Sequence, residues 1–211
     1  MRKTEEGRTP TWYTWIMILF IFGDSITQGY WDNKGGWADR VKASVLAKDI
    51  AHGFASYHGV HNLGIDGNTT RQVIDRFEHE TQARLWPGSD YGVIFSVGIN
   101  DTVFRSQGDF DSTPERYREE LAILSQQARK LTPRVTFLNL CPVDEVQTNP
   151  LPNSSTGKCY TNERIDKFNE ALRDFCETNG LTLIDIHSQF IQHDNILADG
   201  LHPNSDGHRI I

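Results

Sequence analysis

Short apolar runs alternate along the chain with stretches of helical period. Five runs rich in strand-forming residues lie at 16–22, 58–63, 91–97, 134–140 and 181–186. Helical spacing is expected at 37–50, 69–84, 114–131 and 164–180. Several of the strands are apolar at successive positions, as strands buried on both faces are. The alternation therefore predicts an α/β fold with a five-stranded parallel sheet and helices on both of its faces, with boundaries accurate to about two to four residues.

Two of the expected helices carry an apolar stripe on one face. The stripes consist of Tyr117, Leu121, Leu124 and Leu131 in the first helix and Ile165, Phe168, Leu172 and Phe175 in the second. Side chains with this spacing lie on one side of a helix, so both stripes are expected to face the core. Gly180 is expected to end the second helix, because glycine readily adopts the left-handed conformation found at helix C-termini.

The N-terminal segment resembles a signal peptide at first sight, because basic residues precede the apolar run "WIMILFIF". Eight apolar residues are too few to cross a bilayer, and no small-residue cleavage site follows them. We therefore interpret this run as the first strand, residues 1–14 as a flexible tail, and residues 15–211 as a single domain. The final "HPNSDGHRII" begins a helix that stops after about one turn, from which we expect the natural chain to be longer.

Charge and cysteine content narrow the partners and the compartment. The formal net charge of -7, without any basic run, argues against binding to nucleic acid or to an anionic membrane surface. Three cysteines do not make a disulfide framework, although a single Cys141–Cys159 bridge stays open. A reducing, cytoplasmic location is favoured, and secretion by another route is not excluded.

Polar residues of unusual chemistry follow the predicted strands. The sequence reads "GDSIT" after the first strand, "NLGIDGNTT" after the second, "GIND" after the third and "DGLHPN" beyond the fifth. The carboxyl ends of parallel strands meet at one edge of a sheet, whatever their separation along the chain. This arrangement is expected to bring together Ser25, Gly64, Asn100, Asp199 and His202.

These residue types match what acyl transfer through a serine requires. A serine hydroxyl is a poor nucleophile until an imidazole removes its proton, and the imidazole needs a carboxylate to fix its tautomer and stabilise its cation. We expect Ser25 to be the nucleophile, His202 the base and Asp199 its orienting carboxylate. The Ser25 and Gly64 amides and the Asn100 side chain could then stabilise the oxyanion.

These motifs resemble those of the SGNH, or GDSL-type, family of serine esterases and lipases. Its four blocks occur in order as Gly23-Asp24-Ser25, Gly64, Gly98-Ile99-Asn100-Asp101 and Asp199-Gly200-Leu201-His202. The resemblance implies a catalytic triad of Ser25, His202 and Asp199, with Gly64 and Asn100 completing the oxyanion hole. It also implies a flavodoxin-like three-layer α/β/α sandwich. The elbow motif of classical α/β-hydrolases is not matched, since the second glycine of G-x-S-x-G is missing.

Other histidines and carboxylates are interpreted as structural. His58 and His61 are expected on opposite faces of a strand, which argues against a metal pair, and no metal or cofactor is predicted. The side chains that follow the fifth strand lack the DxxH turn; they are Asp185, His187, His193 and Asp194. Asp24 and Asp101 are expected to hold their own loops through backbone hydrogen bonds.

The predicted substrate is a small-molecule ester, such as an acetylated carbohydrate or a lipid. Its acyl group is expected to be short, acetate to butyrate, and a carbohydrate is a candidate for its alcohol side. Tyr30, Trp31 and Trp37 in "GYWDNKGGW" and the irregular loop 143–162 are candidate pocket walls. Motif residues alone leave open an O-acyltransferase acting on a carbohydrate, a lysophospholipase or thioesterase, and a non-catalytic binding module. They also leave the oligomeric state undetermined.

Overall fold

The computed structural model describes residues 16–105, 108–152 and 154–211, so the predicted tail at 1–14 lies outside the described residues. Its main sheet has five parallel strands in the order β2-β1-β3-β5-β7. These strands are β1 (Ile16–Gly23), β2 (Tyr57–Gly64), β3 (Asp90–Ser96), β5 (Val135–Leu138) and β7 (Thr182–Ile184). The predicted five-stranded parallel sheet is confirmed, and the strand order is that of a flavodoxin-like fold.

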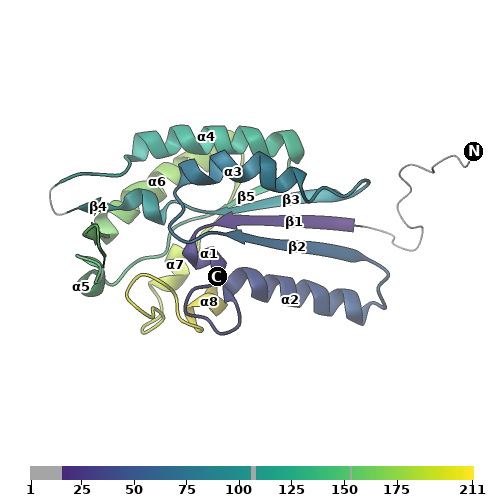
Figure 1. The fold of residues 1–211 in the computed structure, drawn as a ribbon, viewed down its shortest axis with the longest axis horizontal. Coiled ribbons are helices and arrows are strands. Elements are labelled where there is room, and N and C mark those ends of the chain that lie inside the picture. Colours follow the sequence, from purple (N-terminus) through teal and green to yellow (C-terminus); the bar gives the residue numbers. More distant parts are fainter. Residues whose placement is uncertain (1–15, 106–107, 153) are drawn as a thin grey trace, which may run out of the picture.

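Helices form the two outer layers (Figure 1). One layer contains α3 (Thr70–Gln82), α4 (Pro114–Leu131) and α6 (Asn162–Asn179), and the other contains α2 (Gly36–Ala51) and α8 (Gly207–Ile210). Short helical turns lie in the loops that leave the strands; they are α1 (Ser25–Gln28), η1 (Ile99–Thr102), α5 (Glu145–Thr148) and α7 (His187–Phe190). The three-layer sandwich expected from the sequence is thus confirmed.

Local signals in the sequence explain where the long helices begin and end. Thr69 and Gln72 form a capping box at the start of α3, in which each side chain satisfies a backbone amide. Thr113 caps α4 immediately before Pro114, which tolerates the first helical position because its missing amide would have no partner there. Gly180 ends α6 with a φ of 59°, as predicted.

The apolar stripes of α4 and α6 face the sheet. All their predicted members are buried except Leu131, which is half-buried at the end of α4. Aromatic residues fill the centre between these helices and the strands, with Phe22 against Phe95 and Phe95 against Phe137. This packing fixes the strands whose carboxyl ends carry the polar motifs.

The region predicted as an irregular loop, 143–162, contains more structure than expected. Besides α5, it includes strand β6 (Lys158–Cys159), which pairs antiparallel with β4 (Phe104–Arg105). Residue 153 lies outside the described part of the chain. Cys141 and Cys159 are buried free thiols, so the disulfide left open by the sequence is not formed in this structure.

Candidate active site

The strand register brings the first three polar motifs together. Gly23 at the end of β1 lies between Gly64 of β2 and Ser96 of β3. The chain then turns at once into α1, whose first residue is Ser25. Asp24, not Ser25, caps this helix: its Oδ1 accepts a hydrogen bond of 3.0 Å from the Ile26 amide. The Ser25 hydroxyl is therefore not needed as a cap.

Ser25, His202 and Asp199 form a continuous hydrogen-bonded chain. His202 Nε2 lies 2.9 Å from Ser25 Oγ, and His202 Nδ1 lies 2.8 Å from Asp199 Oδ2. An ionised carboxylate can only accept, so the imidazole proton lies on Nδ1 and Nε2 is free to accept the serine proton. This arrangement can activate a serine hydroxyl as a nucleophile.

The turn between Asp199 and His202 presents both side chains to Ser25. Asp199 Oδ1 accepts hydrogen bonds from the Leu201 amide at 3.0 Å and the His202 amide at 2.8 Å. Burial alone would raise the pKa of Asp199. The opposite effects are larger: Asp199 accepts hydrogen bonds from the His202 ring, the His202 amide and the Trp31 indole, and it lies beside the charge of the His202 ring. Together they hold the pKa of Asp199 below its ordinary value. The carboxylate beside His202 is therefore ionised over the ordinary pH range.

Asn100 is held in one orientation by two buried neighbours. It lies in η1, where its Nδ2 donates to the Asn68 carbonyl at 3.1 Å and its Oδ1 accepts from the Tyr160 hydroxyl at 3.2 Å. Because the carbonyl can only accept, the amide group cannot be turned over without losing this bond. The second Nδ2 hydrogen has no partner among the described residues, so the side chain can donate to a ligand.

The predicted role of Gly64 does not fit its surroundings. Its amide already donates to Asn62 Oδ1 at 3.1 Å, and a Cβ built on Gly64 would lie 2.3 Å from the Gln28 amide nitrogen. Glycine is thus required here because α1 packs directly on β2. Gly67 lies three residues further on, in the loop that follows β2. Its amide makes no hydrogen bond within the described residues, and it directly precedes Asn68, which contacts Asn100.

The three aromatic residues predicted as pocket walls lie in different surroundings. Tyr30 stacks on the His202 ring with centroids 5.7 Å apart, and the Trp31 indole donates to Asp199 Oδ2 at 2.7 Å. Trp37 is a correction to the prediction: it is 3% exposed and belongs to the hydrophobic core, so it cannot line an open pocket. Only Tyr30 and Trp31 of this group contact the Ser25–His202–Asp199 chain.

The other titratable residues take structural roles. His58 binds the Asp49 carboxylate at 2.6 Å, and His61 stacks on Phe20. Asp101 accepts from the Thr70 amide at 2.9 Å and hydroxyl at 3.1 Å, so it anchors the start of α3. Burial raises the pKa of Asp24 and that of Asp101, each to about 7.

The side chains that follow β7 also make local contacts. Asp185 binds the Asn139 side chain at 2.7 Å, His187 lies 3.5 Å from the Asp166 carboxylate, and His193 Nδ1 lies 2.9 Å from the Gln189 carbonyl. None of these contacts involves Ser25. Among the described residues, the contacts of these side chains are local, and it is His202 and Asp199 that lie in hydrogen-bonding sequence with Ser25.

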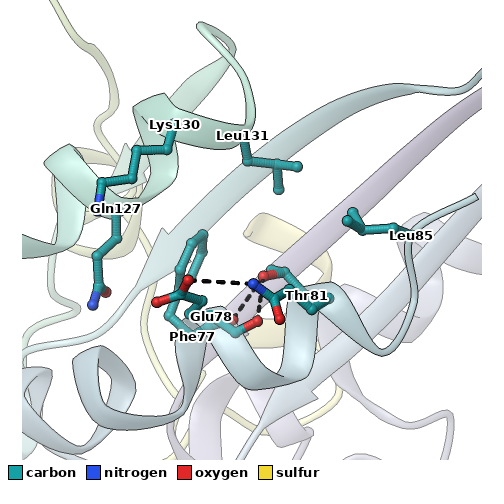
Figure 2. A pocket seen from close by; sticks show the side chains of 8 residues that line it. Phe77, Glu78, Thr81, Leu85, Gln127, Lys130 and Leu131 are labelled. Carbon is teal, nitrogen blue, oxygen red and sulfur yellow. Dashed lines mark hydrogen bonds between the residues drawn. The ribbon is translucent and has the colours of Figure 1, made fainter.

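A pocket with both apolar and polar lining residues lies between α3 and α4, away from this cluster (Figure 2). Its lining includes Phe77, Thr81, Leu85 and Leu131, and it shares no residue with the Ser25–His202–Asp199 chain. Among the described residues, no group of three or more His, Cys, Asp or Glu side chains could hold a metal ion. No helix in the described ranges is both long and apolar enough to cross a membrane.

The fold and the hydrogen-bonded serine, histidine and aspartate define a flavodoxin-like α/β protein with the side-chain arrangement of serine hydrolases. Residues 21–210 match the model of the GDSL-like Lipase/Acylhydrolase family, and the chain belongs to this family of carboxylic ester hydrolases. The resemblance read from the four motif blocks is thereby confirmed.

Individual relatives agree with this assignment. The chain is 26% identical to the GDSL esterase/lipase CPRD49 of Arabidopsis thaliana over 203 residues, which cover 92% of this chain and 75% of that protein. A lipolytic G-D-S-L family protein of Veillonella parvula superposes with a TM-score of 0.68 at 20% identity, covering 92% of this chain and 93% of the other. An acetylxylan esterase of Geobacillus stearothermophilus gives 0.65 at 21% identity, covering 92% and 89%. These two structures share the fold.

Two contacts in the site had no clear sequence signal. Tyr160 and Asn68 hold Asn100, yet an isolated tyrosine in a loop and an asparagine in a turn are unremarkable in sequence. The Gly67 position was detectable, because the "DGN" triplet is typical of a tight turn with a left-handed glycine, and Gly67 has a φ of 73°.

Proposed function

We propose that this chain is a serine esterase that hydrolyses short-chain carboxylic esters through an acyl-enzyme intermediate. Ser25 attacks the ester carbonyl, His202 takes the serine proton and returns it to the leaving alcohol, and Asp199 stabilises the imidazolium. A water molecule, deprotonated by His202, then releases the acid. The observation that carries this proposal is the hydrogen-bonded chain from Ser25 Oγ through His202 to Asp199.

The oxyanion of the tetrahedral intermediate requires donors that are free before substrate binds. We propose the Ser25 amide, the Asn100 side chain and the Gly67 amide, with Gly67 replacing Gly64. Ser25 is the first residue of α1, where a helix leaves its amides unpaired. The bond between Asn100 and the Asn68 carbonyl brings the Gly67–Asn68 turn beside Asn100, whereas the Gly64 amide already has a partner.

The surroundings of the Asp199–His202 turn favour a polar alcohol side. The Asp144 amide donates to the Gly200 carbonyl at 2.8 Å, so the loop 143–162 borders the turn. Beside it lies a groove of about 460 Å³, in which polar side chains stand among apolar ones such as Phe190 and Ile191; the polar ones are Asp144, Gln147, His193, Asp194 and Asn195. Hydroxyl-rich groups such as sugars suit such a lining better than a fatty chain does. We therefore propose an acetylated carbohydrate as the substrate class.

A panel of esters tests the proposal. Nitrophenyl esters from acetate to decanoate and acetylated xylo-oligosaccharides are compared, with Ser25→Ala as the inactive control. We expect a maximum at acetate to butyrate and release of acetate from the oligosaccharides. A maximum at long acyl chains would exclude the short-acyl assignment, and acyl transfer to added sugar in preference to water would indicate an acyltransferase.

A further inference from the structure

Trp31 is the one side chain beyond the triad that hydrogen-bonds to the Asp199 carboxylate among the described residues. Its indole Nε1 lies 2.7 Å from Asp199 Oδ2, the same oxygen that accepts from His202 Nδ1 at 2.8 Å. The other oxygen, Oδ1, is used by the Leu201 and His202 amides. The carboxylate thus has four donors, which is about its full accepting capacity.

The backbone on either side of Trp31 is fixed by contacts of its neighbours. Trp31 has a φ of 63°, a left-handed conformation that is costly for a bulky residue and persists only where surrounding contacts impose it. The next residue, Asp32, binds Arg40 through both carboxylate oxygens, at 2.9 and 3.1 Å, and accepts from the Ser205 hydroxyl at 2.9 Å. The preceding Tyr30 carbonyl binds His208 Nε2 at 3.0 Å. The loop is therefore anchored on both sides of Trp31.

We propose that Trp31 is a positioning residue for the triad: its indole N–H holds the Asp199 carboxylate in the rotation that His202 requires. This inference rests on the proposed esterase function. The indole does not touch the reacting atoms, and it acts through Asp199 alone. Trp31 is 60% exposed, so its indole is held by this bond and by edge contact with Tyr30 more than by burial.

Asp199 Oδ2 accepts from both Trp31 and His202, so the Trp31 bond should affect how activity depends on pH. The indole bond draws electron density from Oδ2 and so weakens the attraction between the carboxylate and protonated His202. Without that bond, the carboxylate stabilises protonated His202 more strongly. As the pH is lowered, activity therefore begins to fall at a higher pH than in the wild type. The other groups near His202 are Asp24, His208 and Tyr30, and they are unchanged by substitution at position 31.

Trp31→Phe removes the indole N–H and keeps an aromatic ring. We expect kcat for nitrophenyl acetate to fall about three- to tenfold with KM within twofold, and the acidic limb of kcat/KM to move up by about half a pH unit. Trp86→Phe is the matched control, because Trp86 precedes β3 at the opposite end of the sheet from Ser25. We expect it to match the wild type.

Two outcomes would overturn the inference. One is wild-type kcat and an unmoved acidic limb in Trp31→Phe; the other is a uniform loss at all pH values with a lower Tm, which would mean that the indole only stabilises its loop. Labelling of Ser25 by a fluorophosphonate, followed against pH, gives the same comparison without a substrate. Failure of the esterase proposal is distinct, since it would show as an inactive, unlabelled wild type.

Discussion

Replacing Asn100 by alanine is expected to slow the reaction and to destabilise the fold, for two different reasons. The substitution removes one proposed oxyanion donor, a loss that typically costs about 3 kcal/mol in the transition state, or about a hundredfold or more in kcat. Substrate binding before the reaction uses this donor little, so KM should change much less. The effect should thus appear as a fall in kcat and in kcat/KM together.

The same substitution also leaves two buried groups without partners. Asn100 binds the Asn68 carbonyl and the Tyr160 hydroxyl, and these residues are 8% and 1% exposed. A buried polar group that loses its partner costs about 1 to 3 kcal/mol. Water entering the space left by the side chain can recover part of this, so we expect the free energy of unfolding to fall by about 2 kcal/mol.

Two further variants assign each loss to its cause. Tyr160→Phe removes the hydroxyl bond but keeps the Asn100 N–H donor, so stability should fall while kcat falls by no more than about tenfold. Asn100→Asp keeps the shape but places a potential negative charge beside the developing oxyanion. We expect its kcat to be at least as low as that of Asn100→Ala.

Steady-state hydrolysis of nitrophenyl acetate and urea unfolding measure the two effects on the same preparations. A rise in KM with unchanged kcat in Asn100→Ala would make Asn100 a substrate-binding residue. An equal loss of kcat in Tyr160→Phe and Asn100→Ala would show that loosened packing, not the missing donor, slows the reaction.

Three other predictions concern the proposed nucleophile, the proposed base and a buried carboxyl. Ser25→Ala should abolish hydrolysis and fluorophosphonate labelling with an unchanged Tm; wild-type turnover would rule out Ser25. Because His202 must be neutral to accept a proton while Asp199 stays ionised, kcat/KM should rise from about pH 5 to 7, and EDTA should not lower it; full activity at pH 4 would contradict a histidine base. Burial raises the pKa of Asp101 from 3.8 to about 7, so the folded state holds a proton that the unfolded chain has lost, and stability falls as pH rises through this range. Asp101→Asn keeps an oxygen that can accept both Thr70 bonds. It should reduce the fall in Tm between about pH 5 and 7 without abolishing it, because Asp24 acts in the same direction. An unchanged slope of Tm against pH would mean that Asp101 is ionised throughout this range.

The sheet and the hydrogen-bonded chain of Ser25, His202 and Asp199 were predictable because both follow from one topological rule. Apolar runs such as β1 identify strands buried on both faces, and parallel strands necessarily bring their following loops to one edge. Ser25 and His202 are 177 positions apart, yet the rule places them together without any knowledge of side-chain packing. The DxxH spacing then fixes Asp199 next to His202.

Positions that depend on packing between neighbouring loops were less predictable. Gly64 and Gly67 stand in the same motif, and composition cannot tell which amide is free; this depends on Asn62 folding back onto Gly64. Trp37 likewise follows the same polar turn as Trp31, but α2 begins at Gly36 and turns the indole into the core. A difference of six positions along the chain separates a core residue from one that contacts Asp199.

The role of the loop 143–162 depends on a pairing that local sequence does not indicate. Strand β4 begins two residues after η1, and Phe104 of β4 pairs with Cys159 of β6. Tyr160, the residue after this pair, is thereby brought back to Asn100, where its hydroxyl meets Oδ1. Two-residue strands have too little hydrophobic pattern to be recognised, so the sequence predicts an irregular connection at this point. The pairing turns that connection into a support for Asn100, and changes near Tyr160 should therefore affect kcat as well as substrate choice.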